Sequence, residues 1–269
     1  MGLESHKRVK IVTLERLNSD SDGNLTHAFC TRLGGVSQGP FRSLNFDPNG
    51  GDSRENVTQN KLILGAALQL DPDRIFLANQ VHGDKVLILD EDPRESPSRY
   101  HYLDYDAIIT QQRGIAIGVL TADCLPVIVY DPVQEVIGIL HSGWRGTCLN
   151  IVRNVIARLR DAFHVESDNL LVGLGPAIGA CCYDVDIKVV RSIKNSTNRW
   201  KDFLKPLKTN RYSFDLVGLN IHQLLDTGVA HKNIIRVNAC TACNPKIFFS
   251  HRANKGKTGR QLNLVALKP

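Results

Sequence analysis

The sequence predicts an α+β fold, with a single domain over residues 1–269 in which mixed β-sheets pack together and helices lie outside them. Apolar runs typical of strands are frequent, whereas only three segments have the apolar spacing of an amphipathic helix. The two kinds of segment do not alternate regularly, which disfavours a doubly wound parallel fold. With 42% hydrophobic residues, a chain of 269 residues has enough apolar side chains for one large core.

Short runs rich in β-branched and other apolar residues are predicted as strands. They cover residues 10–14, 25–30, 85–89, 107–109, 115–120, 127–130, 136–140, 170–174 and 234–237. Residues 1–10 (MGLESHKRVK) are expected to form a flexible N-terminus. This segment has no apolar core, so we do not expect a secretory signal there.

Three segments place apolar side chains on one helical face: residues 56–68, 147–163 and 215–227. Asp215 is the expected N-cap of the third helix, and Gly228 is its expected stop. Residues 91–102 are polar and interrupted by proline, and they are predicted as a surface loop.

The net charge of +6 comes from Lys and Arg residues that are scattered along the chain. A nucleic-acid-binding protein more often concentrates them in one stripe, so we expect no nucleic-acid partner. Attraction for a small anion such as phosphate would account for this charge, and so would chance. No apolar run approaches the roughly 18 residues of a membrane span, so we expect no membrane partner. The seven cysteines are an odd number, which disfavours a disulfide framework and favours a reducing, cytoplasmic location.

A predicted hairpin brings a cysteine and a histidine together. The tetrapeptide Asp131-Pro132-Val133-Gln134 has the pattern of a type I turn and separates two apolar runs. If the loop closes at residues 131 and 134, Cys124 faces His141 directly, with their Cβ atoms roughly 4.5–5.5 Å apart. A register slip of one residue would put the two side chains on opposite faces of the hairpin.

This pair could hold a metal ion or form a Cys/His catalytic pair. Catalytic zinc uses three protein ligands and one open position, so a third ligand is needed, and His82 is the candidate. Gln80 and Asp84 flank His82 and are candidates for orienting its ring. The alternative is that Cys124 is a small core residue and His82 a hydrogen-bonded loop histidine.

Two glycine-containing loops carry candidate anion-binding residues. Residues 31–45 (TRLGGVSQGPFRSLN) combine turn formers, hydroxyls and arginines, so Arg32, Ser43 and Asn45 are candidates for holding phosphate or ribose. An ordinary surface loop is the alternative. Residues 251–260 (HRANKGKTGR) are rich in basic residues, and Arg252 is the candidate there.

Arg145 stands four residues after His141 and is predicted to reach the same cavity. The remaining cysteines have weaker signals. Cys240 and Cys243 match Cys-x-x-Cys, but neither thioredoxin-like surroundings nor further metal ligands are evident near them in sequence, so coincidence or a structural role is expected. Cys181 and Cys182 are adjacent, which suits packing better than an ordinary disulfide.

Several motifs together carry a family resemblance. ANQVHGD, LTADCLPV, HSGWRGT and GLGPAIGACCYDV occur in this order, preceded by TRLGGVSQGPFRSLNF and followed by FFSHRANKGKTGR. With these motifs the chain resembles the bacterial YfiH/YlmD family, formerly called multicopper polyphenol oxidases or laccase-domain proteins. The resemblance runs from about residue 27 to residue 260.

The resemblance implies a YfiH-like α+β fold and a cytosolic enzyme acting on purine nucleosides and phosphate. The family is described as phosphorolysing adenosine, inosine, guanosine and methylthioadenosine, and as deaminating adenosine. It carries zinc on residues that correspond here to His82, Cys124 and His141. Asp184, in the CCYDV motif, becomes a candidate acid or base. One departure is that Ala253, not a second basic residue, follows Arg252.

We therefore expect a monomer or weak oligomer with zinc-dependent nucleoside chemistry, and Cys124, His141 and Asp184 as catalytic candidates. Asp123 and Asp184 are the candidates for protonating the leaving purine. An alternative is a cysteine hydrolase in which His141 activates Cys124 against a peptidoglycan-precursor peptide. A copper polyphenol oxidase fits less well, because laccase-type enzymes use many histidines. A binding domain without turnover is a fourth interpretation.

Overall fold

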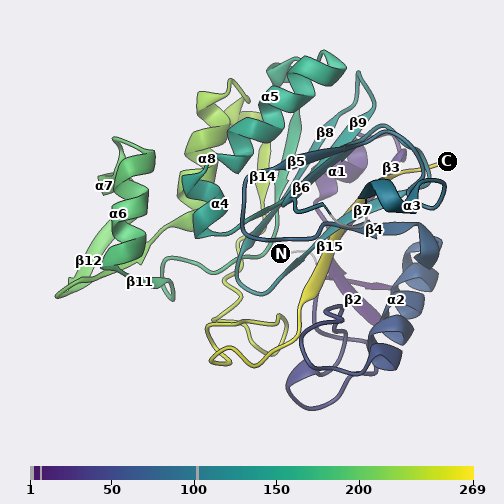
Figure 1. Cartoon of the computed structure of the whole chain (residues 1–269), viewed down its shortest axis with the longest axis horizontal. Helices are drawn as coiled ribbons and strands as arrows, with labels where there is room; N and C mark the ends of the chain where they lie inside the picture. Colours follow the sequence, from purple (N-terminus) through teal and green to yellow (C-terminus); the bar gives the residue numbers. More distant parts are fainter. Residues whose placement is uncertain (1–2, 7, 101–102) are drawn as a thin grey trace.

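The computed structural model describes residues 3–6, 8–100 and 103–269. Two sheets of six strands form its centre, and a small third sheet projects from one side with α6 (Ile187–Ser196) and α7 (Trp200–Phe203) (Figure 1). Parallel and antiparallel pairs occur in both large sheets, so the predicted fold of mixed sheets and outer helices is confirmed.

The first sheet has the order β1-β2-β3-β15-β7-β4. Its strands, in that order, are Leu3–His6, Val9–Val12, Leu25–Cys30, Gln261–Leu267, Ala116–Thr121 and Ile75–Leu77. The second sheet has the order β14-β10-β8-β9-β6-β5, with strands Ile234–Arg236, Leu171–Leu174, Leu125–Asp131, Val136–Ser142, Ala107–Thr110 and Val86–Leu89. The third sheet has the order β11-β13-β12, with strands Asp184–Asp186, Arg211–Phe214 and Leu204–Lys208.

The layers follow from where the apolar side chains pack. One cluster of buried residues lies between the two large sheets, and it includes Phe29, Val119, Ile128 and Ile139. On its other face the first sheet packs against α2 (Arg54–Leu68). The second sheet is covered on its outer face by helices α4, α5 and α8, which span Trp144–Cys148, Ile151–Phe163 and Leu216–Asp226.

Strand β8 shows why the run from Leu125 to Tyr130, directly after Cys124, is apolar throughout. Val127 and Val129 pack toward the helices, whereas Ile128 and Tyr130 pack toward the first sheet. Because both faces of this strand are buried, no polar alternation appears in the sequence.

The predicted elements are present, but one is divided and others were not predicted. The helix expected over residues 147–163 is divided into α4 and α5, because Asn150 adopts a left-handed conformation at φ 62°. Strands β4 and β15, the third sheet, and helices α6 and α7 were not predicted. Gln261 and Asn263 interrupt the apolar pattern of β15, yet both are buried and hydrogen-bonded. Asp215 does cap α8, since its carboxylate accepts the Gly218 N–H at 2.8 Å.

Two segments differ from the expected loops. Within residues 1–10, which were expected to be flexible, β1 pairs antiparallel with β2, while residues 1, 2 and 7 lie outside the described part. Within residues 91–102, Pro97–Tyr100 forms the short helix α3, and residues 101 and 102 are not described. The remaining short helix, α1, spans Glu15–Ser19. Among the described residues, no helix combines the length and apolarity that crossing a membrane requires.

Candidate metal centre and active site

The β8–β9 hairpin forms where it was predicted, but its register is shifted by two residues. Asp131 pairs with Val136, so the loop contains four residues, and Glu135 occupies a left-handed conformation at φ 49°. The Asp131 carboxylate accepts the N–H groups of Val133 and Gln134, which fixes the loop. The prediction of a direct Cys124–His141 pair was therefore wrong by two positions.

The two side chains nevertheless share one face of the hairpin. His141 pairs with Pro126, and Cys124 lies two residues before Pro126, just ahead of the strand. A shift of two residues preserves the face, whereas a shift of one would reverse it. The Cys124–His141 pair is thus diagonal, and Gly143 occupies the position nearest Cys124. A Cβ atom at Gly143 would lie only 3.0 Å from Cys124 Sγ.

His82 reaches the pair from the loop between β4 and β5. Its backbone has a left-handed conformation at φ 61°, and the buried carboxylate of Asp106 stabilises this turn. Asp106 accepts the N–H groups of Val81, His82 and Gly83 at 3.1, 3.0 and 2.7 Å. The imidazole rings of His82 and His141 stand edge to face, with centroids 4.8 Å apart.

Gln80 and Asp84 do not orient the His82 ring as expected. Gln80 exchanges two hydrogen bonds with the backbone of Leu120, and Asp84 accepts from Asn154. The Asp106 carboxylate holds the His82 backbone instead, a role that no sequence pattern predicted. It also contacts Nδ1 of His141 at 2.7 Å. The sequence places Asp106 directly before a buried strand, but a single carboxylate in such a position does not by itself indicate a residue that supports a site.

The ligand atoms of His82, Cys124 and His141 all lie within 4.8 Å of one another. Two imidazoles and one thiolate form a donor set that zinc accepts, and three protein ligands leave a fourth position open. Because Nδ1 of His141 faces Asp106, Nε2 is the nitrogen available to a metal, as in the usual carboxylate–histidine–metal arrangement. The residues present therefore fit a metal ion.

The charges in the cluster favour a thiolate. Burial alone would raise the pKa of Cys124, but His141 and His82 outweigh it and lower this pKa to about 6. Burial alone would lower the pKa of His141, but the Cys124 thiolate and the Asp106 carboxylate raise it to about 9. A thiolate is thus available at neutral pH, which is the form that binds metals.

A cavity of ≈ 640 Å³ opens over the three ligands, within the size range of small-molecule sites. Its wall includes two aromatic side chains, Trp144 and Tyr183, and Leu216. Four basic side chains also line it: Arg145, His251, Arg252 and Arg260. Asp47 and Asn49, on the segment that follows β3, also line the cavity.

The basic residues of the cavity differ in the hydrogen bonds that their side chains already form within the protein. Arg252 donates to the carbonyl oxygens of Cys182 and Asp184 and lies over the Tyr183 ring. Arg260 donates to the carbonyl of Gly259. Arg145 is exposed and lies over the Trp144 ring, and no hydrogen bond joins its guanidinium to another described residue.

Arg32 and Ser43 lie elsewhere, in a separate hollow that also contains Arg8 and Arg42. Arg32 donates to the carbonyls of Arg42 and Pro245 and lies over the Phe249 ring. The Ser43 hydroxyl accepts the N–H groups of Gly34 and Gly35. These contacts hold the loop of residues 31–45 in shape, which differs from the expected role in binding substrate.

Asn45 is also buried and stands behind the cavity wall. Its side-chain oxygen accepts the N–H groups of Asp47 and Arg260, so it positions two residues that do line the cavity. Sequence alone could not separate such a supporting residue from a contacting one, because both are polar and lie in the same loop.

Neither candidate for protonating the purine is free to do so. Asp184 is paired with Arg211 at 2.8 Å, and this hydrogen bond lowers the pKa of Asp184. Asp123 lines the cavity, but its carboxylate accepts from the Thr241 hydroxyl at 2.6 Å and from the Arg252 N–H at 2.7 Å. Its left-handed φ of 96° is therefore held by contacts to the segment after β14.

Comparison with known proteins gives a consistent result. A family model described as multi-copper polyphenol oxidoreductase laccase matches residues 26–268. The chain is 32% identical over 243 residues to the purine nucleoside phosphorylase YlmD of Geobacillus stearothermophilus, with 87% of each chain covered. It is 29% identical over 264 residues to the adenosine deaminase RL5 of an unknown prokaryotic organism, with 92% of this chain and 97% of the other covered.

The fold agrees with these matches. The crystal structure of Bacillus licheniformis YfiH superposes with a TM-score of 0.90 and 29% identity, and 99% of both chains is covered. The resemblance carried by the sequence motifs is thereby confirmed. The chain belongs to the family described as multi-copper polyphenol oxidoreductase laccase, to which its YfiH- and YlmD-like motifs point.

Proposed function

We propose that the protein is a zinc-dependent purine nucleoside phosphorylase that cleaves adenosine, inosine, guanosine and methylthioadenosine and also deaminates adenosine. The observation that carries this proposal is the convergence of His82, Cys124 and His141 beneath one cavity. Relatives named as a purine nucleoside phosphorylase and an adenosine deaminase support the two activities. The free cysteines suit the cytoplasmic location that we propose.

In this proposal His82, Cys124 and His141 hold the zinc ion, and Asp106 orients His141. When bound, zinc supplies Lewis-acid chemistry at its open coordination position. Asp106 keeps the imidazole of His141 turned so that Nε2 faces the cluster. Trp144 lines the same cavity and contributes apolar surface to it.

The cavity wall offers complementary contacts for a nucleoside and phosphate. Trp144 and Tyr183 present aromatic surface on which a purine can stack. Burial raises the pKa of Tyr183, so its hydroxyl stays protonated and can donate a hydrogen bond. Asp47 and Asn49 can accept from and donate to ribose hydroxyls. Arg145, whose guanidinium has no hydrogen bond to another described residue, can bind phosphate, and Arg252 and His251 line the same cavity.

Phosphorolysis requires phosphate oxygen to bond to the anomeric carbon while the bond to the purine nitrogen breaks. Cationic side chains can bring phosphate to that carbon and stabilise the charge that develops. Deamination replaces the purine amino group with oxygen from water and releases ammonia. The two activities thus differ in whether phosphate takes part.

Two other functions use the same residues. A cysteine hydrolase, with peptidoglycan-precursor peptides as substrates, is favoured by the lowered pKa of Cys124 beside His141. A copper oxidase is less well supported. Of the nine histidines, two are in the described cluster, and the other described group of potential ligands contains only cysteines.

The test is an assay of purified protein with adenosine, with and without phosphate, in which mass spectrometry identifies the products. Bound metal is measured in the same sample. We expect adenine and ribose 1-phosphate only when phosphate is present, and inosine in both conditions. Cys124→Ala should remove both activities, whereas Cys148→Ser, at a half-buried cysteine outside the centre, should retain them. Full phosphorolysis by chelated Cys124→Ala protein would refute the metal role.

A further inference from the structure

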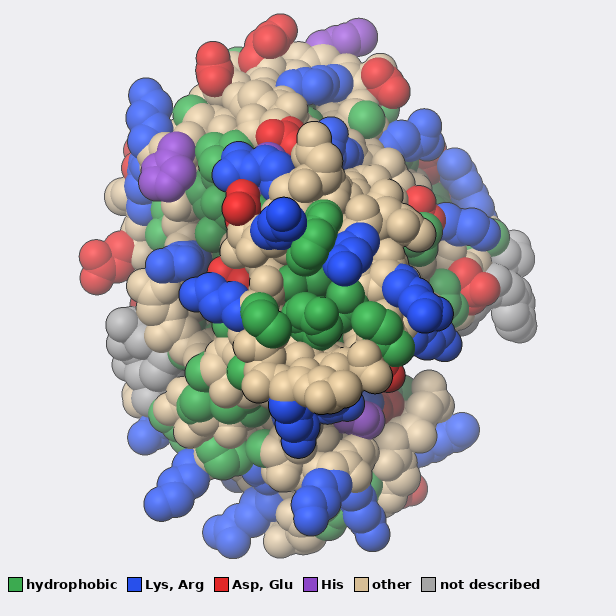
Figure 2. Space-filling view, turned by 90° about the vertical axis from the view of Figure 1, so that its left-hand side faces the viewer, with side chains coloured by type: hydrophobic (Ala, Val, Ile, Leu, Met, Phe, Trp, Pro, Cys, Tyr) green, Lys and Arg blue, Asp and Glu red, His purple; other side chains and the backbone are tan. Residues whose placement is uncertain are grey.

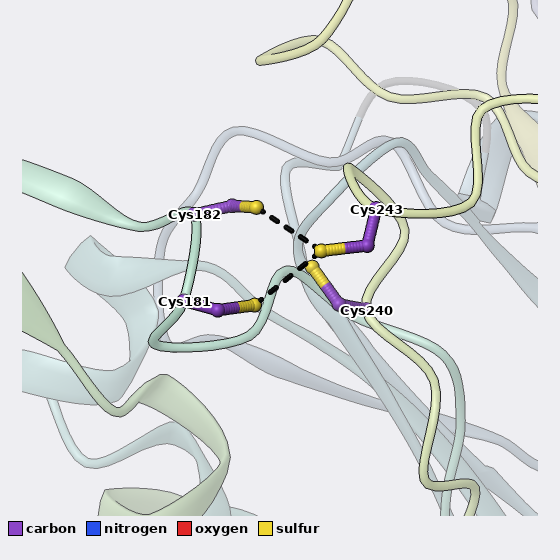
Figure 3. Close-up of side chains that lie close together, drawn as sticks. All are labelled: Cys181, Cys182, Cys240 and Cys243. Atoms are coloured by element: carbon purple, nitrogen blue, oxygen red, sulfur yellow. Dashed lines mark hydrogen bonds between the residues drawn. The ribbon is translucent and has the colours of Figure 1, made fainter.

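A second group of potential metal ligands lies outside the candidate active site. Cys181, Cys182, Cys240 and Cys243 come together from two segments, and their Sγ atoms all lie within 4.8 Å of one another (Figure 3). None of the four lines the cavity above His82, Cys124 and His141. The Cys-x-x-Cys motif thus has the partners that were not evident near it in sequence.

The backbone turns all four side chains toward one point. The N–H groups of Cys182 and Tyr183 both donate to the carbonyl of Gly179 at 3.0 Å, so Cys181 and Cys182 occupy a tight turn rather than an extended strand. In a strand, neighbouring side chains would point to opposite faces. Here both thiols point toward Cys240 and Cys243.

The segment that contains Cys240 and Cys243 is held in a fixed position relative to this turn. Residue Cys240 forms an isolated bridge with Ala177, and the Thr241 N–H donates to the Ala177 carbonyl at 3.0 Å. The N–H of Gly179 points at Cys240 Sγ at 3.2 Å. Such backbone donors stabilise the negative charge of metal-bound thiolates and fix their orientation.

The sulfur spacing fits a tetrahedral metal better than a disulfide. The Sγ atom of Cys243 is 3.3 Å from that of Cys182 and 3.5 Å from that of Cys181. A disulfide bond is about 2.05 Å long, and all four cysteines are free thiols. Four sulfurs at 2.3 Å from a zinc ion would be about 3.8 Å apart. A disulfide would use Cys243 with one partner and leave two clustered thiols unexplained.

We propose that Cys181, Cys182, Cys240 and Cys243 bind one zinc ion as a closed, four-thiolate structural site. Binding releases the thiol protons to solvent and involves no oxidation or reduction. The ion would join the loop after β10 to the segment after β14, which are separated in sequence by the third sheet and by α6, α7 and α8. Closing a loop of this length is where a metal clip gains most stability.

The bound zinc ion would also fix one wall of the cavity above His82, Cys124 and His141. Tyr183 directly follows the cysteine pair, and Arg252 donates to the Cys182 carbonyl at 3.2 Å. Thr241 lies between the other two cysteines and donates to Asp123 at 2.6 Å. Both segments of the clip therefore connect to residues that line the cavity, although the cysteines themselves stay outside it.

The test is zinc content per chain, measured by plasma mass spectrometry on protein purified without chelators. We expect two zinc ions in the unmodified chain, one in Cys124→Ser and one in the double variant Cys181→Ser/Cys243→Ser. Cys148→Ser, which changes a cysteine outside both groups, should retain two. The triple variant Cys124→Ser/Cys181→Ser/Cys243→Ser should lose the increase in Tm that added zinc gives to Cys124→Ser.

A second measurement remains informative if the double variant fails to fold. Cobalt added to metal-free Cys124→Ser protein should give the intense thiolate-to-cobalt absorption of a four-thiolate tetrahedral site. The proposal is overturned if Cys124→Ser binds neither zinc nor cobalt at these cysteines. It is also overturned if freshly purified, unreduced protein is lighter by two hydrogen atoms with a disulfide mapped to this group.

Discussion

One imidazole, that of His141, lies between two partners of negative charge. Asp106 contacts Nδ1 at 2.7 Å, and Cys124 lies on the side of the cavity. The same carboxylate accepts the backbone N–H groups of the His82 turn. A single buried residue therefore positions two of the three candidate metal ligands without being one of them.

Replacing Asp106 with asparagine should weaken metal binding about 10–100-fold, the usual effect of losing such a supporting contact. The amide keeps one acceptor oxygen but brings an N–H₂ group toward the backbone donors of residues 81–83. Competition with a chromophoric chelator would measure the affinity. Asp104→Asn, at a carboxylate that binds only the exposed Asn79 side chain among described residues, is the matched control. Equal affinities for the two variants would contradict the assigned role.

The thiol of Cys124 should react with iodoacetamide at low pH in metal-free protein. Its pKa is lowered to about 6, so its thiolate fraction should rise through a midpoint near pH 6. Burial raises the pKa of Cys148, which provides an internal control that reacts only at higher pH. Peptide mapping after timed alkylation gives both profiles, and bound zinc should protect Cys124. Coincident profiles for the two cysteines would refute the proposed charge environment.

At the scale of elements, the junction between β9 and α4 sets the spacing of the metal ligands. Gly143 is the N-cap of α4, and its backbone angles of φ −82° and ψ 176° are open to any residue. It is close contact that requires glycine, because an added Cβ would lie 3.0 Å from Cys124 Sγ and 3.2 Å from the His82 ring. Behind it, Ser142, Thr147 and Asn220 form a buried hydrogen-bonded network that joins α4 to α8.

Gly143→Ala should therefore displace the Cys124 thiolate or the His82 ring and lower zinc affinity by at least tenfold. The fold should remain, because the backbone conformation suits alanine. Gly83→Ala is the control, since its added Cβ would meet other atoms only at 3.5 Å or more. Isothermal titration with zinc distinguishes the two variants. An unchanged zinc affinity in Gly143→Ala would show that the added Cβ displaces neither Cys124 nor His82, and it would contradict the role assigned to Gly143.

At the scale of the molecule, the two large sheets bury His27, whose titration should make the stability of the fold depend on pH. His27 is buried, and its Nε2 accepts the Leu14 N–H at 2.9 Å, while Nδ1 has no partner among described residues. Burial lowers the pKa of His27 to about 4, despite the opposing effect of Glu4. The neutral imidazole is therefore favoured in the folded state.

The stabilisation from neutral His27 should be complete above pH 6.5, the unfolded value, and be lost as the pH falls toward 4. A shift of this size corresponds to at most about 3 kcal/mol in the free energy of unfolding. His27→Gln keeps an acceptor for Leu14 but cannot titrate, so its stability should change less over this interval. Urea unfolding at pH 7 and pH 4.5 measures the difference. Parallel pH profiles for both proteins would contradict this assignment.

The sequence predicted the fold class, and it named three residues that the structure brings together, better than it predicted the surroundings of the candidate site. The hairpin prediction correctly put Cys124 and His141 on one face, because its register error of two residues does not change the face of a side chain. Asp106 and the four-cysteine group were missed, since their partners lie far away in sequence. Asn45 was named as a substrate-binding candidate, but its supporting position behind the cavity wall was not predicted. Arg32 and Ser43 were expected at the substrate, yet they stabilise their own loop. Polarity in a loop does not tell which way a side chain points.

The surface is consistent with small-molecule binding in a local cavity. Basic side chains are dispersed over the face in Figure 2 and are mixed with acidic ones, as the scattered charges in the sequence predicted. In the proposed function, phosphate is bound by the basic side chains that line the cavity. Among them, Arg145 has no hydrogen-bonded partner among the described residues.

The central claim is that zinc held by His82, Cys124 and His141 supports purine nucleoside phosphorolysis. Its most direct test is to remove all metal, add zinc back in steps, and follow adenine release from adenosine and phosphate. We predict that activity returns in proportion to zinc bound by the unmodified protein, and that Cys124→Ala stays inactive at every zinc concentration. Full activity in the metal-free protein, or recovery of Cys124→Ala with zinc, would contradict it.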